Sequence, residues 1–144
     1  GIYKVSDEIK NEIKESFYGG CADDIKCADT IKDTYEKHGY VTDTHTAVAV
    51  CVHNEYVKET GDNTKTIIAS TASPFKFNGA VLSALGKEDE VNELDEFRLL
   101  EKLANDYELR IPASLKTLEE KEVRFEVVCD KNQMKAVINE FLAN

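Results

Sequence analysis

Two short stretches contain the side chains best suited to bind a small ligand. The first, residues 67–77, reads IIASTASPFKF and places Ser70, Thr71 and Ser73 where an apolar run ends. In an open α/β sheet, ligands lie at the carboxyl ends of strands and face the amino termini of helices. Ser70 and Thr71 are therefore candidate ligand-binding hydroxyls, although the same hydroxyls can simply bond to neighbouring backbone in a turn. Ser73 before Pro74 is a typical helix N-cap.

The second stretch, residues 43–47, reads DTHTA and also precedes a predicted helix. Asp43 and Thr44 are both capping types, and His45 can act as a neutral donor or a proton carrier. Lys76 lies near the end of the first stretch, one turn inside the predicted helix, and an isolated lysine at such a position is typically solvated.

Metal binding and nucleophilic catalysis are poorly supported by the remaining residues. His45 and His53 are eight positions apart and lack the i, i+4 spacing of zinc-binding helices. Cys51 and His53 are two apart and point to different helix faces, so we expect Cys51 in the core. The four cysteines have no CxxC spacing, and neither GxGxxG nor GxxxxGK[ST] occurs. No metal site is predicted.

Hydrophobic periodicity and capping residues predict a helix-rich α/β chain that forms one domain over residues 1–144. Residues 65–70 (KTIIAS) read as a buried strand, and residues 123–129 as a strand or an extended segment. The predicted helices are 7–17, 24–38, a buried helix from 44 to 60, 74–85, 92–106, a turn after Pro112, and a final helix capped by Asp130. So few short strands do not make a self-sufficient sheet, which indicates part of a larger fold.

Composition excludes several classes of partner. The formal net charge of −10 argues against nucleic-acid binding and against an anionic membrane surface. No apolar run approaches the roughly 20 residues that span a bilayer. The charged start is no signal peptide, so a reduced, cytoplasmic setting is expected.

Taken together and in order, the two stretches resemble a known family. GYVTDTHTAVAV, followed by IIASTASPFKF, is similar to the carboxyl-terminal part of threonine synthases, where the patterns run like DPHTAVG and STAHPAKF. The upstream FYGGCADDIKCADTIKDTYEKHGY and the tail from IPASLKTL to MKAVINEFL also resemble that family. This chain has Thr44 where the family usually has proline and Ser73 where it often has histidine, so no family role is carried over to the side chain at position 73.

The resemblance implies the carboxyl-terminal portion of a fold-type II pyridoxal-phosphate enzyme with a three-layer α/β/α fold. Such an enzyme converts O-phosphohomoserine and water to threonine and phosphate, using pyridoxal 5'-phosphate on a lysine as the electron sink. The pyridine nitrogen of the cofactor typically meets a serine or threonine hydroxyl near the carboxyl end. Thr71 is the first choice for that partner and Ser70 the second.

The resemblance also shows what these residues lack. The family's lysine, in a pattern like FKD, and its glycine-rich phosphate loop belong to the amino-terminal half, and Lys76 lies in a different motif. We therefore expect an inactive fragment that binds no cofactor alone and can self-associate through an exposed strand edge. A threonine-synthase-like phospholyase and a non-catalytic ligand- or protein-binding module remain alternatives.

Overall fold

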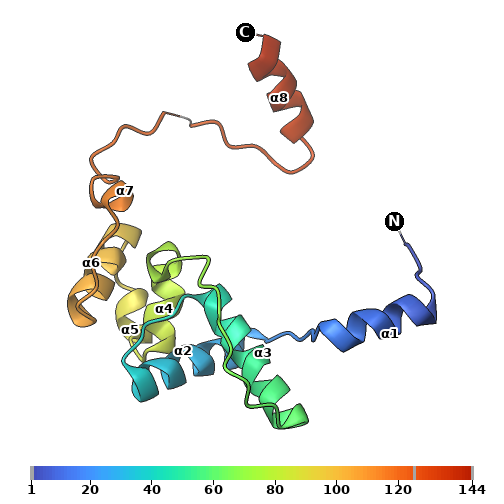
Figure 1. Cartoon of the computed structure of the whole chain (residues 1–144). Helices are drawn as coiled ribbons and strands as arrows, with labels where there is room; N and C mark the ends of the chain where they lie inside the picture. Colours follow the sequence, from blue (N-terminus) through green and yellow to red (C-terminus); the bar gives the residue numbers. More distant parts are fainter. Residues whose placement is uncertain (1, 125, 144) are drawn as a thin grey trace. The chain divides into compact units, whose positions relative to one another are not determined.

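The computed structural model describes residues 2–124 and 126–143, in two compact units, Gly1–Ile111 and Pro112–Asn144 (Figure 1). The first unit contains α1 (Asp7–Ser16), α2 (Asp24–His38), α3 (Thr44–Thr60), the short 3-10 helix η1 (Pro74–Phe77), α4 (Asn78–Ala84), α5 (Glu88–Val91) and α6 (Glu96–Asp106). The second contains α7 (Ala113–Lys116) and α8 (Met134–Ala143). None of the described helices has the length and apolar content needed to cross a membrane.

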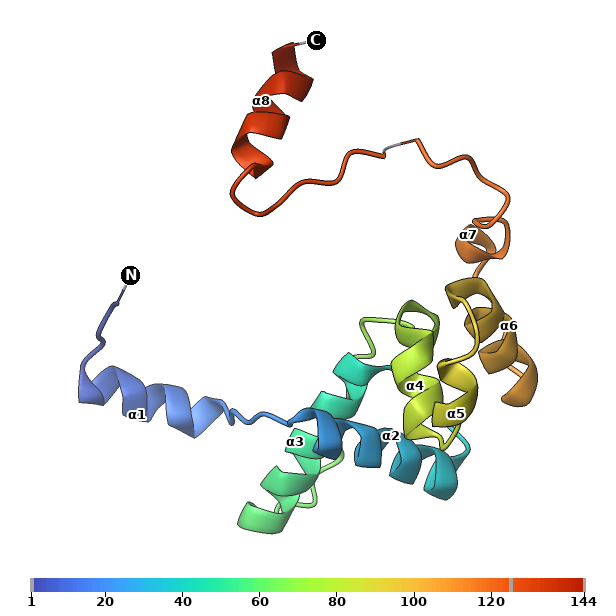
Figure 2. The ribbon, with the colours of Figure 1, turned by 180° about the vertical axis from the view of Figure 1, so that it is seen from behind.

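The core of the first unit lies where α2, α3, α4 and α6 meet. Helix α4 packs against both α2 and α6, and views from opposite sides agree on this arrangement (Figure 2). Among the described residues, the larger apolar side chains that are almost completely buried there are Ile31, Val81, Leu82 and Leu103. Burial of side chains of this size contributes about 1.5–3 kcal/mol each, so these contacts hold the helices together.

The predicted helix ends are largely confirmed. Ser6 caps α1 by accepting a hydrogen bond from the Ile9 N–H at 3.3 Å, and Asp23 caps α2 in the same way. Helices α2 and α3 end at Gly39 and Gly61, whose φ angles of 64° and 70° lie in the left-handed region that favours glycine.

The predicted strands are wrong for the described part of the chain. Residues 65–70 are extended, but no backbone group there is hydrogen-bonded to another strand. For residues 123–129 the sequence leaves a strand or an extended segment open, and the strand is not formed by the described residues, 123–124 and 126–129. β-branched residues favour extended backbone, yet a sheet also needs neighbours with which to pair. The prediction of a helix-rich chain is confirmed, whereas the chain by itself does not show the three-layer arrangement.

Some details of the helices also differ from expectation. The helix expected over 74–85 is divided into η1 and α4, and α8 begins at Met134, because Asp130 instead closes a turn with the Gln133 N–H at 2.8 Å. The last predicted position, 144, lies outside the described residues. The apolar spacing of the helix over 24–38 predicts an inward Ile25, but Ile25 is 74% exposed, since Lys26 faces α3 and adjacent helical residues point about 100° apart.

Helix α3 was expected to be buried on nearly every side, and this is only partly right. Ala47 and Cys51, one turn apart, are buried against the rest of the unit. Ala49, between them, is exposed. Helix α3 therefore has more apolar side chains than its packing in this unit buries.

Gly20 marks a close approach between the segment after α1 and helix α3. A Cβ atom at this position would lie 2.9 Å from Val52 Cγ1, whereas a Cβ at Gly19 would meet nothing within 4 Å. We predict that Gly20→Ala lowers the free energy of unfolding by about 1–3 kcal/mol through overpacking. Gly19→Ala is the matched control and should change it by less than about 1 kcal/mol. Urea unfolding of both variants measures the difference, and equal effects would contradict this packing.

Candidate functional site

The two sequence stretches meet in the structure. Helix α3 begins at Thr44, and the extended segment 62–72 runs back beside the start of this helix. The hydroxyl oxygens of Thr46 and Ser70 lie 3.1 Å apart. Residues 24 positions apart in the sequence are thus joined by a direct side-chain hydrogen bond.

Asp43 is the centre of this junction. Its Oδ1 accepts hydrogen bonds from the backbone N–H groups of His45 (2.8 Å) and Thr46 (3.1 Å), and its Oδ2 accepts one from the Thr46 hydroxyl (2.5 Å). The residue is only 1% exposed. Of the two capping candidates in the sequence, Asp43 rather than Thr44 therefore caps α3.

The environment of Asp43 favours its charged form. Burial acts to raise the pKa of this carboxyl, but the hydrogen bonds from Thr46 and His45 outweigh burial and hold the pKa below its usual value. The Nδ1 atom of His45 lies 3.6 Å from Oδ1 of the carboxylate. The start of α3 consequently carries a buried, hydrogen-bonded negative charge and is not open to a bound anion.

The two candidate hydroxyls differ in their surroundings. Ser70 and Thr71 are both exposed. Ser70 is tied to Thr46, whereas the Thr71 hydroxyl forms no hydrogen bond to any residue in the described part of the chain. Ser73 accepts a hydrogen bond from the Phe75 N–H at 3.4 Å, which confirms it as the cap of η1.

The start of the extended segment is fixed by Asp62. This carboxylate accepts hydrogen bonds from the N–H (2.9 Å) and the hydroxyl (2.6 Å) of Thr64 and from the Tyr56 hydroxyl (2.7 Å). The Thr64 bonds, followed by the Tyr56 bond, lower the pKa of Asp62 to about 2. One end of the segment is thus held by Asp62 and the other by Thr46.

The aromatic ring of Phe77 lies close to both basic side chains of the motifs. The rings of His45 and Phe77 have centroids 5.0 Å apart, and the Lys76 Nζ lies 5.4 Å from the centroid of Phe77. Lys76 is exposed, as expected from the sequence. The structure thereby brings His45 and Lys76 to one aromatic side chain, a proximity that sequence spacing did not indicate.

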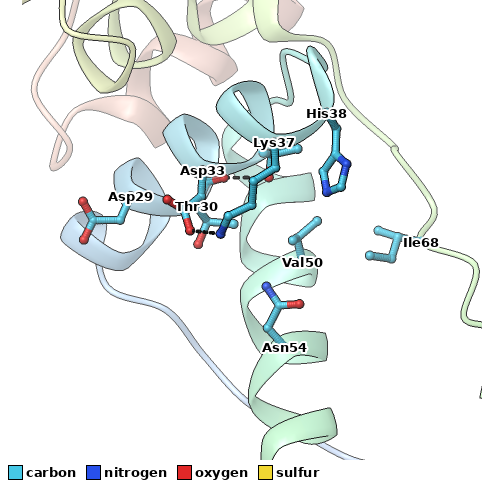
Figure 3. Close-up of a pocket in the computed structure, with 9 residues that line it drawn as sticks. Asp29, Thr30, Asp33, Lys37, His38, Val50, Asn54 and Ile68 are labelled. Atoms are coloured by element: carbon cyan, nitrogen blue, oxygen red, sulfur yellow. Dashed lines mark hydrogen bonds and ion pairs between the residues drawn. The ribbon is translucent and has the colours of Figure 1, made fainter. Parts of the chain in front are cut away.

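A hollow of about 420 Å³ lies between α2 and α3, and residue 68 of the extended segment also lines it (Figure 3). Ile68 lines it from the extended segment, and Asp33 and Lys37 line it from α2. The Lys37 ammonium lies 2.6 Å from the Asp33 carboxylate, so these opposite charges pair with each other. This hollow contains none of the candidate residues.

The other sequence candidates stay apart from the junction. Cys51 is buried and its prediction as a core residue is confirmed. Among residues 2–124 and 126–143, no three histidine, cysteine or acidic side chains are grouped so as to hold a metal ion. Thr46 is the residue that sequence reasoning missed. The available signal was that Thr46 follows the Asp43 cap by three residues, because a polar side chain at that position of a helix can bond to the cap residue.

Comparison with known proteins identifies the family. A family model described as "Threonine synthase, C-terminal" matches residues 46–138, which is more than half of the chain. The chain belongs to the threonine synthase family. Both Thr46 and the stretch from Ser70 to Phe77 fall within the matched region.

Individual relatives of the threonine synthase family agree with this assignment. Human (Homo sapiens) "Threonine synthase-like 1" is 29% identical over 147 aligned positions, which cover 99% of this chain and 19% of that protein. "Threonine synthase" of Methylobacillus glycogenes is 38% identical over 74 positions, 51% of this chain and 15% of that protein. "Threonine synthase" of Schizosaccharomyces pombe is 33% identical over 93 positions, 64% of this chain and 18% of that protein. The chain spans less than a fifth of the length of these relatives.

The lowered pKa of Asp43 predicts a pH dependence of stability. A carboxyl whose pKa is lower in the folded chain stabilises the fold above its unfolded pKa, and this contribution is lost as the pH falls through the folded pKa. The ordinary value is 3.8. Asp43→Asn is the non-titrating comparison, because asparagine also caps helices well.

We expect the stability advantage of the natural chain over Asp43→Asn to be constant above about pH 5 and to decline toward about pH 2. Urea unfolding at several pH values measures it. An advantage that grows on acidification would show that the folded state does not favour the charged carboxylate.

Proposed function

We propose that this chain is the carboxyl-terminal segment of a threonine synthase, which uses pyridoxal 5'-phosphate to convert O-phosphohomoserine and water to threonine and phosphate. The observation that carries the proposal is the family match over residues 46–138. The direct hydrogen bond between its two motif stretches supports it. The parent protein is then a pyridoxal-phosphate lyase to which this segment contributes part of a site.

The residues present fit one end of the cofactor. A pyridine ring nitrogen takes a single hydrogen-bond partner, and Ser70 and Thr71 offer exposed hydroxyls on two consecutive residues. When bound, the cofactor supplies an electron sink, whose strength depends on the partner of its ring nitrogen. Thr71, whose hydroxyl is free of other bonds within the described residues, is our first choice for this partner, and Ser70 is the second.

A second candidate function is favoured by one comparison. The alignment with human threonine synthase-like 1 covers 99% of this chain, whereas the alignments with the two threonine synthases described above cover 51% and 64% of it. A threonine-synthase-like phospholyase would use the same cofactor and release phosphate from a different amino-acid phosphate ester. A polypeptide carrying an FKD-type lysine pattern together with this segment, tested with both substrate classes, separates the two.

The 144-residue chain alone should be inactive. Its sequence contains neither an FKD pattern nor a glycine-rich phosphate loop. Incubated with pyridoxal 5'-phosphate and O-phosphohomoserine, it should release no phosphate above a protein-free control. Measurable release would contradict both the assignment as a partial site and the need for a lysine outside it.

The ring-nitrogen assignment predicts the effect of Thr71→Val in a complete polypeptide that carries this segment. Loss of one hydrogen bond to the cofactor should lower kcat about tenfold, equivalent to about 1.4 kcal/mol, while the absorbance of the lysine-bound cofactor remains. Thr66→Val, a substitution in the same extended segment but four residues before Ser70, is the control and should leave kcat unchanged. Unchanged turnover in Thr71→Val would rule out Thr71 as the partner.

A further inference from the structure

Another hollow lies where the end of α1 and the segment after it meet the second half of α3. It has a volume of about 470 Å³, and its wall includes Phe17, Tyr18 and Tyr56. We propose that this hollow binds a small organic ammonium ion, such as a protonated primary amine. The inference goes beyond the proposed function and does not rest on it, because the wall contains none of residues 43–47 or 67–77.

Two contacts hold the aromatic part of this wall in place. The rings of Tyr18 and Tyr56 pack edge to face, with centroids 5.1 Å apart and an interplanar angle of 64°. The backbone after α1 also approaches α3 closely at Gly20, where an added Cβ would lie 2.9 Å from Val52. Aromatic side chains from two separate parts of the chain thus form one wall, and the faces of such rings attract cations.

The two tyrosine hydroxyls have no proton to offer a ligand. Tyr18 donates to the Glu59 carboxylate at 2.8 Å, and Tyr56 donates to the Asp62 carboxylate at 2.7 Å. These hydrogen bonds are the main reason that the pKa of each tyrosine is raised. Because a hydroxyl has a single proton, each of these oxygens has only lone pairs left for a ligand.

The threonine hydroxyls in the wall are committed in the same way. Thr60 donates to the backbone carbonyl of Tyr56 at 2.8 Å, and Thr66 donates to the backbone carbonyl of Thr64 at 3.1 Å. A polar group that enters the hollow therefore meets acceptors on these side chains. To satisfy them, it must bring N–H or O–H groups of its own.

The charges around the hollow favour a positive ligand. Lys14 and Glu15 line it from the end of α1 and have opposite charges. The carboxylates of Glu59 and Asp62, which hold the two tyrosine hydroxyls, add negative charge. Asp62 is ionised at neutral pH, because its bonds with Thr64 and Tyr56 lower its pKa to about 2.

An ammonium ion is the ligand that matches all of these features. Its N–H groups donate to the hydroxyl lone pairs, its charge is attracted by the carboxylates, and its alkyl chain packs on the rings. A phosphate or carboxylate ligand would instead face Glu59 and Asp62, and Lys14 and His53 are the basic side chains in the wall that could offset them. A neutral alcohol would gain nothing from the charges.

The selectivity for a cation can be tested on the 144-residue chain. Butylammonium, 1-butanol and butyrate have similar alkyl chains and carry positive, no and negative charge. Butylammonium should bind with a dissociation constant on the order of 1 mM, a typical strength for so small a ligand, and about tenfold more tightly than the other two. NMR titration measures this, and the CH₂ protons beside the nitrogen should shift upfield in the ring currents. Equal binding of the alcohol, or tighter binding of butyrate, would overturn the proposal.

The aromatic wall is tested by Tyr56→Leu, which removes one ring. The affinity for butylammonium should fall about threefold to tenfold. Tyr40→Leu is the matched control, because Tyr40 is 52% exposed and lies outside the wall, and it should leave the affinity unchanged. Tyr18→Phe keeps its ring and leaves the Glu59 carboxylate available, so it should bind at least as tightly as the natural chain. Loss of binding in Tyr18→Phe, or an equal loss in Tyr40→Leu, would contradict this wall.

The charge contribution is tested without removing a ring. Glu59→Gln keeps an oxygen that accepts from Tyr18 but removes the negative charge, so the affinity should fall about threefold or more. Glu93→Gln removes an equal charge from an exposed position outside the wall and is the control. Lys14→Gln removes a positive charge from the wall and should raise the affinity. Equal losses in Glu59→Gln and Glu93→Gln would show attraction to the overall charge of −10 only and would overturn the proposal.

Discussion

The burial of one carboxylate, that of Asp43, is the constraint on which the rest of the site depends. A charge that is taken out of water must be compensated by hydrogen bonds, and each compensating group here is fixed by the first turn of α3. The same carboxylate therefore starts the helix, orients the Thr46 hydroxyl, and through it holds Ser70. One buried group couples the backbone of a helix end to a side chain at the surface.

The helical part of this fold could be predicted from local sequence because its signals are local. Capping side chains such as Ser6 and Asp23 bond to N–H groups three residues away, and Gly39 and Gly61 end helices through their own backbone freedom. The prediction of a strand at residues 65–70 was wrong because a strand, unlike a helix end, depends on contacts that are not local in the sequence. A β-strand exists through a partner, and composition cannot say whether the partner is present in the same chain.

The candidate site shows the same division. Ser70 and Thr71 could be predicted as candidates from their position at the end of an apolar run. The resemblance to threonine synthases then made Thr71 the first choice and Ser70 the second. The contact between Thr46 and Ser70 could not be predicted, because it depends on how the loop after α3 returns along the helix. The contact between the rings of His45 and Phe77 is likewise a tertiary contact, between motifs that are separate in the sequence.

The extended segment between Asp62 and Ser70 has a consequence for dynamics. Since its backbone has no strand partner among residues 2–124 and 126–143, the segment depends on side-chain anchors at its two ends, and its amide protons should exchange with water without opening the helical core. Local opening there requires only the loss of a few hydroxyl contacts. The surface hydroxyls thus lie on a segment that can open independently of the helical core, and a neighbouring strand that paired with this backbone would hold them more rigidly.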